Sequence, residues 1–161
     1  MDEKVFYSSM PSPIGELLLV SDGRRLTGLH MEQHKSGGTV QPHWRRDDAQ
    51  LKDARGQLEA YFKGERCTFD LPFEGAGTVF QRRVWQVLCD IPYGETISYG
   101  ELARRIGQPT ASRAVGLANG QNPIAVIVPC HRVIGANGSL TGYGGGLPRK
   151  QWLLAHEKRV L

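Results

Sequence analysis

Short apolar segments alternate with turn-forming residues over the first thirty positions of the chain. The apolar segments are Lys4–Ser8, Glu16–Val20 and Leu26–His30. Between them stand Pro-Ser-Pro-Ile-Gly at 11–15 and Ser-Asp-Gly at 21–23, both typical of turns. This pattern predicts three short strands in an antiparallel meander.

The periodicity changes after this meander. Residues 33–46 follow no regular pattern and are predicted to form a loop. Apolar side chains then recur at helical spacing over Asp48–Phe62, and Gly64 is expected to end that helix. A short strand is predicted at Cys67–Leu71. The Pro72–Gly77 stretch, rich in glycine and proline, is the best candidate for a linker.

The rest of the chain predicts helices. Thr78-x-x-Gln81 has the pattern of a capping box before a helix with one apolar face, and Ser98-x-x-Glu101 repeats that pattern before a helix that reaches Ile106. A third helix is predicted over Thr110–Ala118 and a last one over Arg149–Lys158. The two short central helices, joined by a Gly-containing turn, fit a helix-turn-helix, and an ordinary pair of packed helices fits equally well.

These elements predict an α/β (α+β) protein. A small antiparallel sheet with one helix would occupy residues 1–77, and a mostly helical domain with a helix-turn-helix would occupy residues 78–161. The 161 residues, 40% of them hydrophobic, suffice for one domain with a subdomain or for two small ones. No apolar run approaches the ~20 residues of a membrane span, and the polar Met1–Lys4 start does not resemble a signal peptide. We therefore expect a cytoplasmic protein without a membrane partner.

Charge is divided unevenly between the two halves. Residues 1–77 hold 10 Lys and Arg against 12 Asp and Glu, a net charge of −2, whereas residues 78–161 hold 10 against 4, a net charge of +6. A basic surface beside a helix pair suits DNA binding, although surface charge also serves solubility alone.

One cysteine carries the clearest chemical signal. The chain has three, Cys67, Cys89 and Cys130, an odd number at long spacing that fits neither a disulfide framework nor a Cys-x-x-Cys zinc site. We expect Cys67 and Cys89 to be buried and unreactive. The same interpretation is open for Cys130, but His131 follows it directly, and an imidazole is a common activator of a thiol nucleophile.

Adjacent side chains point to opposite faces of an extended chain. Contact between Cys130 and His131 therefore needs a sharp bend after Pro129 or a bridging water. A carboxylate would orient the imidazole from its far nitrogen, and Glu157 is our candidate. The Gly142–Gly146 run lacks the Gly-Lys-Ser/Thr ending of a phosphate loop, so a nucleotide site is rejected.

Several segments together resemble one family. The Pro-Cys-His-Arg core within Ile127–Ile134 is similar to the active-site signature of the O6-alkylguanine-DNA alkyltransferases. The resemblance extends over residues 78–160, whereas residues 1–77 match the family's variable N-terminal domain only in length and strand pattern. The further segments that carry it are Thr78–Trp85, Asn122–Pro123, Ile91–Tyr99, Arg113–Gly116, Thr141–Leu147 and Leu153–Glu157.

The resemblance implies a protein that repairs DNA by direct reversal and is used once. Cys130 would accept the alkyl group from O6 of guanine, and possible activity on O4-alkylthymine stays open. His131 would act as a base through water, and Glu157 would orient it. Tyr99 would donate toward N3 of the leaving guanine, and Asn122 would be the hinge between the recognition helix and the cysteine.

The resemblance also implies a way of binding double-stranded DNA. Arg113 would fill the space left by a flipped base, and its alternative is an ordinary phosphate contact. Ser112 and Ala114, with the other small residues of that helix, suit close approach to the minor groove or tight packing on the preceding helix. The base pocket would be lined by Val133, Tyr143 and Gly144, the last standing where relatives often have serine.

No cofactor is expected. Some relatives hold zinc in the N-terminal domain, but here that region has only Cys67 with His30, His34 and His43, so we predict none. We expect a monomer, with cooperative binding on DNA left open. Two other classes compete: a lesion-binding protein that transfers nothing, which would lack an acceptor cysteine, and a Cys-His-Glu hydrolase, which would need oxyanion donors and repeated turnover.

Overall fold

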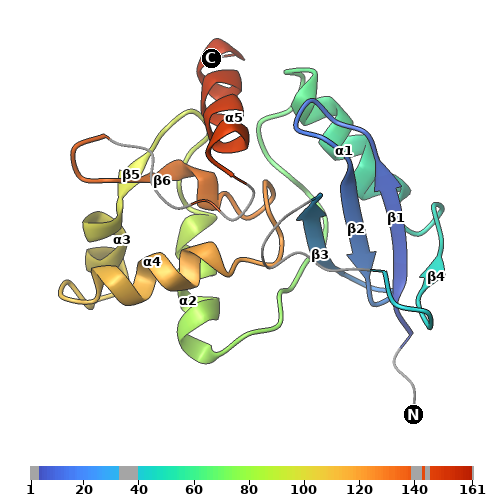
Figure 1. Cartoon of the computed structure of the whole chain (residues 1–161), viewed down its shortest axis with the longest axis horizontal. Helices are drawn as coiled ribbons and strands as arrows, with labels where there is room; N and C mark the ends of the chain where they lie inside the picture. The colour runs from blue at the N-terminus through green and yellow to red at the C-terminus, as the bar shows by residue number, and fades with distance from the viewer. Residues whose placement is uncertain (1–3, 33–39, 139–142, 144–145, 161) are drawn as a thin grey trace.

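The computed structural model describes residues 4–32, 40–138, 143 and 146–160 of the chain. Strands and a single helix form its first part, and helices dominate its second part (Figure 1). The elements of the first part are β1 (Phe6–Met10), β2 (Leu17–Ser21), β3 (Leu26–Met31), β4 (Arg45–Arg46) and α1 (Lys52–Phe62). Those of the second are α2 (Val79–Leu88), β5 (Ile97–Ser98), α3 (Tyr99–Arg105), α4 (Ser112–Gly120), the 3-10 helix η1 (Cys130–Arg132), β6 (Val133–Ile134) and α5 (Leu147–Val160).

The first part is built on a four-stranded sheet in the order β3-β2-β1-β4. The predicted meander is present, since β1 pairs antiparallel with β2 and β2 with β3. The prediction of a loop over 33–46 was wrong at its end, because Arg45 and Arg46 pair parallel with β1. Both arginines are exposed, and so short a polar edge strand gives no periodic signal.

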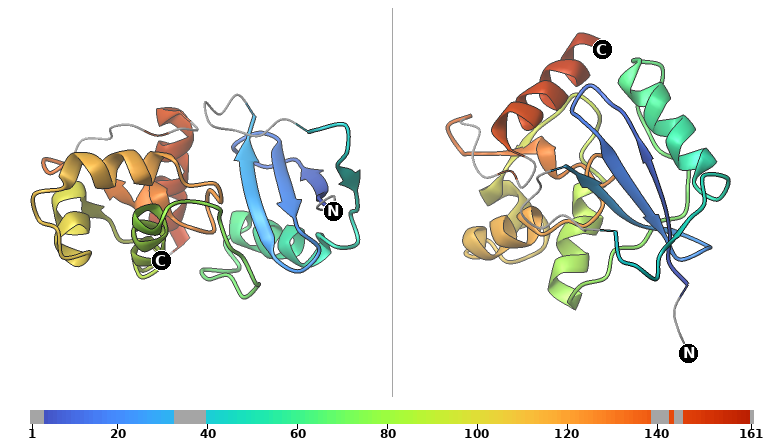
Figure 2. Two further views of the ribbon diagram at one scale, coloured as in Figure 1. Left: turned by 90° about the horizontal axis from the view of Figure 1, so that it is seen from below. Right: turned by 45° about the vertical axis from the view of Figure 1, so that its right-hand side comes forward.

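Helix α1 covers one face of this sheet (Figures 1 and 2). It begins at Lys52 rather than at the predicted Asp48, because the preceding residues form turns in which Asp47 accepts from the backbone of Gln50. The strand predicted at Cys67–Leu71 is absent. The Gln57 side chain bonds both the N–H and the carbonyl of Asp70, so that backbone is satisfied without a neighbouring strand.

The second part packs α2, α3 and α4 together beside the sheet (Figure 2). The Thr78–Gln81 capping box is fully formed at the start of α2. The second predicted box is only half formed: Ser98 accepts from the Glu101 N–H, but the Glu101 carboxylate pairs with nearby arginines instead. The predicted third helix lies two residues further along the chain than expected.

Backbone contacts join the two parts. Leu29 of β3 donates to the Pro123 carbonyl at 2.9 Å and accepts from the Ala125 N–H at 3.2 Å, so the segment before the cysteine continues the sheet edge. In the linker, Gly77 lies so close to α2 that an added Cβ would stand 2.5 Å from the Trp85 ring. One apolar core runs through both parts. Across the described residues no helix is both long and apolar enough to span a bilayer.

Candidate active site

The segment around Cys130 turns sharply. Pro129 has ψ of 63° and leads into η1, so Cys130 and His131 occupy a tight turn rather than extended chain. The predicted bend after Pro129 is present, but among the described residues no hydrogen bond joins the Cys130 thiol to the His131 imidazole. Four residues before Cys130, Val126 has a φ of 69°, a left-handed conformation that strains a β-branched residue. Cys130 is 6% exposed and His131 is fully buried.

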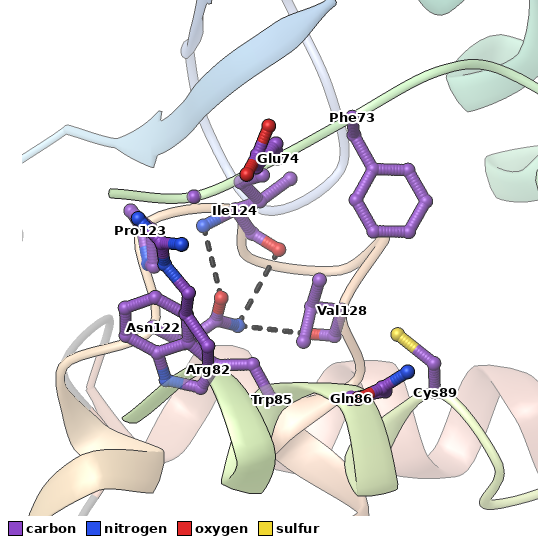
Figure 3. Close-up of a pocket in the computed structure, with 11 residues that line it drawn as sticks. Phe73, Glu74, Arg82, Trp85, Gln86, Cys89, Asn122, Pro123, Ile124 and Val128 are labelled. Carbon is purple, nitrogen blue, oxygen red and sulfur yellow. Dashed lines mark hydrogen bonds between the residues drawn. The ribbon is translucent and has the colours of Figure 1, made fainter. Parts of the chain in front are cut away.

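Asn122 holds this loop in shape (Figure 3). Its side-chain amide donates to the Val128 carbonyl at 2.8 Å and to the Ile124 carbonyl at 3.4 Å, while its oxygen accepts from the Ile124 N–H at 3.0 Å. Asn119, at the end of α4, donates to the Cys130 carbonyl at 3.3 Å. Two asparagines therefore tie the cysteine turn to the end of the helix that precedes it.

The structure brings His131 and Glu157 together. Nε2 of His131 lies 2.7 Å from Oε2 of Glu157, and both side chains are buried. Because the carboxylate only accepts, the hydrogen on the imidazole is assigned to Nε2. Nδ1 then carries a lone pair, and this atom has no hydrogen-bond partner among the residues that the structure describes. Burial lowers the pKa of His131 and outweighs the opposing effect of Glu157, so the imidazole is neutral at pH 7.

Glu157 receives several donors at once. Arg132 binds it with two nitrogens, Nε to Oε1 at 2.8 Å and Nη2 to Oε2 at 2.9 Å. The Gly94 N–H adds a contact to Oε1 at 3.3 Å. Burial alone would raise the pKa of Glu157, but the bonds from His131 and Arg132 hold it well below its usual range. The carboxylate that accepts from Nε2 of His131 is thus charged.

The thiol of Cys130 has the opposite setting. Burial raises its pKa above the ordinary value, and this effect exceeds the opposing influence of the Asn122 side chain, the Lys150 charge and the Tyr143 hydroxyl. Lys150 is itself buried and donates to the Val133 carbonyl at 2.6 Å. Cys130 is therefore a thiol at neutral pH, and a role as nucleophile would require a base to remove its proton.

The other predicted site residues lie around this centre or away from it. Tyr143 faces the thiol and Val133 is buried directly after η1, whereas Gly144 lies outside the described residues. Tyr99 begins α3, and its ring stands beside Gly116 of α4. The residues predicted to contact DNA do not join the cysteine cluster: they are exposed on the first turn of α4 and are Ser112, Arg113 and Ala114.

Sequence reasoning missed four buried polar residues of the site: Tyr61, Asn119, Arg132 and Lys150. Arg132 stands inside the motif, but charged side chains are rarely buried unless paired, and its partner lies 25 residues further on. The Tyr61 hydroxyl donates to Oε2 of Glu157 at 2.7 Å across 96 residues of sequence. No local pattern could have indicated either contact.

The prediction that Cys67 and Cys89 are buried was wrong, because both are exposed. Cys89 comes after the last residue of α2, where it no longer belongs to the apolar face. Among the described residues no cluster of three or more His, Cys, Asp or Glu is arranged to hold a metal ion, and His34 lies outside them. The absence of zinc stays a prediction.

A cavity of about 450 Å³ opens between α2, the linker and the loop held by Asn122 (Figure 3). Its lining includes Phe73, Trp85, Cys89 and Asn122. Neither Cys130 nor His131 lines it. The cavity therefore does not open on the thiol or the imidazole, although it shares Asn122 with the cysteine centre.

Fold and site together define a two-part protein that places a buried cysteine, histidine and glutamate behind a helix-turn-helix. Comparison with known proteins names the class. The model "6-O-methylguanine DNA methyltransferase, ribonuclease-like domain" matches residues 5–74, and "6-O-methylguanine DNA methyltransferase, DNA binding domain" matches residues 79–159. The chain belongs to the 6-O-methylguanine DNA methyltransferase family, which confirms the resemblance found in the sequence.

Individual relatives agree over nearly the whole length. The chain is 55% identical over 157 residues to "Methylated-DNA--protein-cysteine methyltransferase" of Mycobacterium tuberculosis, covering 96% of this chain and 93% of the relative. It is 51% identical over 153 residues to the protein of the same name from Methanosarcina acetivorans, covering 95% and 98%. A solved structure, "Crystal structure of Mycobacterium tuberculosis OGT in complex with DNA", superposes with a TM-score of 0.90 at 55% identity and covers 96% of this chain and 94% of that one. The predicted fold class is confirmed.

Proposed function

We propose that this protein repairs O6-alkylguanine in duplex DNA by transferring the alkyl group to its own Cys130. The observation that carries the proposal is a buried thiol in the Pro-Cys-His-Arg turn, beside a histidine whose far nitrogen is held by a buried carboxylate. The relatives' name, which specifies methylated DNA and a protein cysteine, supports the same reaction.

The reaction needs a base because the resting thiol is protonated. His131 offers a lone pair at Nδ1, and a water between Nδ1 and the thiol would carry the proton from sulfur to imidazole. Sulfur then bonds to the alkyl carbon as the bond from that carbon to O6 breaks. Glu157 stabilises the imidazolium that forms, and the Tyr99 hydroxyl donates toward N3 of the departing guanine, which lowers the cost of its negative charge.

The product explains why the protein acts once. Attack on a saturated carbon creates no oxyanion, so no oxyanion hole is required. The product is a thioether, which has no carbonyl that water could attack. Cys130 is therefore consumed, with one alkyl group accepted per chain.

Helix α4 is the proposed contact with DNA. Its first turn exposes Ser112, Arg113 and Ala114, and Leu117 one turn later is 65% exposed. Small and apolar side chains allow a helix to approach the minor groove closely, and an exposed arginine can occupy the position of a flipped base. The flipped base would then reach a pocket lined by Val133, Tyr143 and Gly144.

The wider organisation is proposed on the same basis. Residues 78–161 would carry DNA binding and alkyl acceptance, and residues 1–77 would form the N-terminal domain. Asn122, bonded on both sides of the loop, would act as the hinge between α4 and the cysteine. We propose a monomer that acts in the cytoplasm, where it would meet chromosomal DNA.

Mass measurement tests the reaction directly. Incubation with duplex DNA that contains O6-methylguanine should add one methyl mass to the Cys130 peptide, and Cys130→Ala should accept none. Cys67→Ala and Cys89→Ala are matched controls, because they remove exposed thiols and should still accept one methyl per chain. An unmodified Cys130 after complete incubation would refute the proposal, and product formed beyond one equivalent would indicate a hydrolase instead.

A further inference from the structure

Glu157 receives a donor from the opposite part of the molecule. Tyr61 belongs to α1, which covers the N-terminal sheet, and its side chain is fully buried. Its hydroxyl donates to Oε2 of Glu157 at 2.7 Å. The proposed alkyl-transfer centre therefore includes one polar group that residues 78–161 do not supply.

The Tyr61 hydroxyl donates to the same carboxylate oxygen of Glu157 as His131 does. Oε2 of Glu157 accepts from Nε2 of His131 at 2.7 Å, from Nη2 of Arg132 at 2.9 Å and from the Tyr61 hydroxyl at 2.7 Å. Oε1 is shared by Arg132 and the Gly94 N–H. Each donor on an oxygen reduces the negative charge that remains for the others. Tyr61 thus limits how strongly Glu157 holds a proton on the imidazole.

The hydroxyl of Tyr61 is held in place by its surroundings. His156 of α5 bonds the Tyr61 carbonyl at 2.7 Å, and its ring lies 5.3 Å from the Tyr61 ring. Phe69 and Tyr93 pack on the same ring at 5.6 and 6.0 Å. His156 and Glu157 are consecutive residues of α5, and both bond Tyr61. Tyr61 therefore fixes α1 against a single turn of α5.

We propose that Tyr61 is a positioning residue for alkyl transfer, through which the N-terminal part of the protein orients Glu157 and tunes the basicity of His131. The inference rests on the proposed function, because only that function makes His131 the base. It gives residues 1–77 a defined contribution to the chemistry without any contact to the substrate.

The test is the pH dependence of methyl transfer under single-turnover conditions. In Tyr61→Phe the Glu157 carboxylate loses one donor and therefore holds the imidazolium of His131 more strongly. The pH midpoint of the acidic limb of the rate profile should then rise by about 0.5 to 1 unit. Tyr93→Phe is the matched control. Its hydroxyl is buried in the same aromatic cluster but bonds nothing among the described residues, so this profile should match the wild type.

A second variant keeps the test decisive if Tyr61→Phe folds poorly. A ring-fluorinated tyrosine at position 61 keeps the shape of the side chain and makes the phenol a stronger donor, so the limb should move downward in pH. Wild-type protein that accepts no methyl group would overturn the proposed function itself. Wild-type protein that accepts one methyl, with unchanged limbs in the position 61 variants, would overturn the role of Tyr61 alone.

Discussion

Replacing Arg132 with methionine should severely destabilise the protein. Met keeps much of the apolar stem but removes a guanidinium that makes two bonds to Glu157 and one to the Ile91 carbonyl at 2.7 Å. Glu157 is 1% exposed, so the change leaves a buried carboxylate without its cation. Breaking such a pair from one side typically costs about 3 to 5 kcal/mol, a large share of the roughly 5 to 15 kcal/mol that stabilises a domain.

Urea denaturation of the DNA-free protein at pH 7 measures this loss. Arg104→Met is the matched control, because Arg104 also pairs with a glutamate but is 61% exposed. An exposed pair contributes little, so the control should lose no more than about 0.5 kcal/mol. The double variant Arg132→Met/Glu157→Gln should recover part of the loss, since no charge is then left unpaired. A loss below about 1 kcal/mol in Arg132→Met would refute this reasoning.

Four further outcomes are expected. Asn122→Ala should lower the free energy of unfolding by about 1 to 3 kcal/mol in urea, because buried loop groups lose their partner, and a loss under about 0.5 kcal/mol would contradict this. His131 has a lowered pKa when folded, so the unfolded chain takes up a proton first as pH falls below about 6.5, and stability should fall there by up to about 1.4 kcal/mol per pH unit. His131→Gln should lose that component below about pH 6.5, and equal slopes in both proteins would exclude it. Arg113→Ala should impair repair of duplex DNA far more than reaction with a free O6-alkylguanine base, whereas equal losses would exclude a role in flipping. Tyr99→Phe should slow methyl transfer with little change in DNA affinity, and an unchanged rate would remove its role toward the leaving base.

The fold was predictable where the signal is local. The three strands of the meander and the helix before Gly64 follow from periodicity, and the capping box at Thr78 formed as expected. The errors arose where tertiary contacts override local pattern. Gln57 satisfies the Asp70 backbone and removes a predicted strand, and the edge strand at Arg45 exists only because β1 lies beside it.

The site was predictable only as far as short sequence motifs reach. Cys130 and His131 are adjacent, and the resemblance implied Glu157. The structure adds a different kind of information, namely that burial raises the pKa of the thiol and lowers that of the imidazole. Such shifts depend on which groups surround a side chain in space, and Arg132, Lys150 and Tyr61 become neighbours of the centre only in the folded chain.

Tyr61 and Glu157 are separated by 96 positions in the sequence, and this separation has a consequence for how the protein matures. Closing a loop between residues so far apart in the chain costs conformational entropy that the contact must offset. During synthesis α1 leaves the ribosome well before α5, so the carboxylate meets its tyrosine only after the helices between them have been made. A chain in which α1 is not docked against α5 would carry Glu157 without this donor. The pH dependence of methyl transfer to Cys130 would then report whether both ends of the chain have come together.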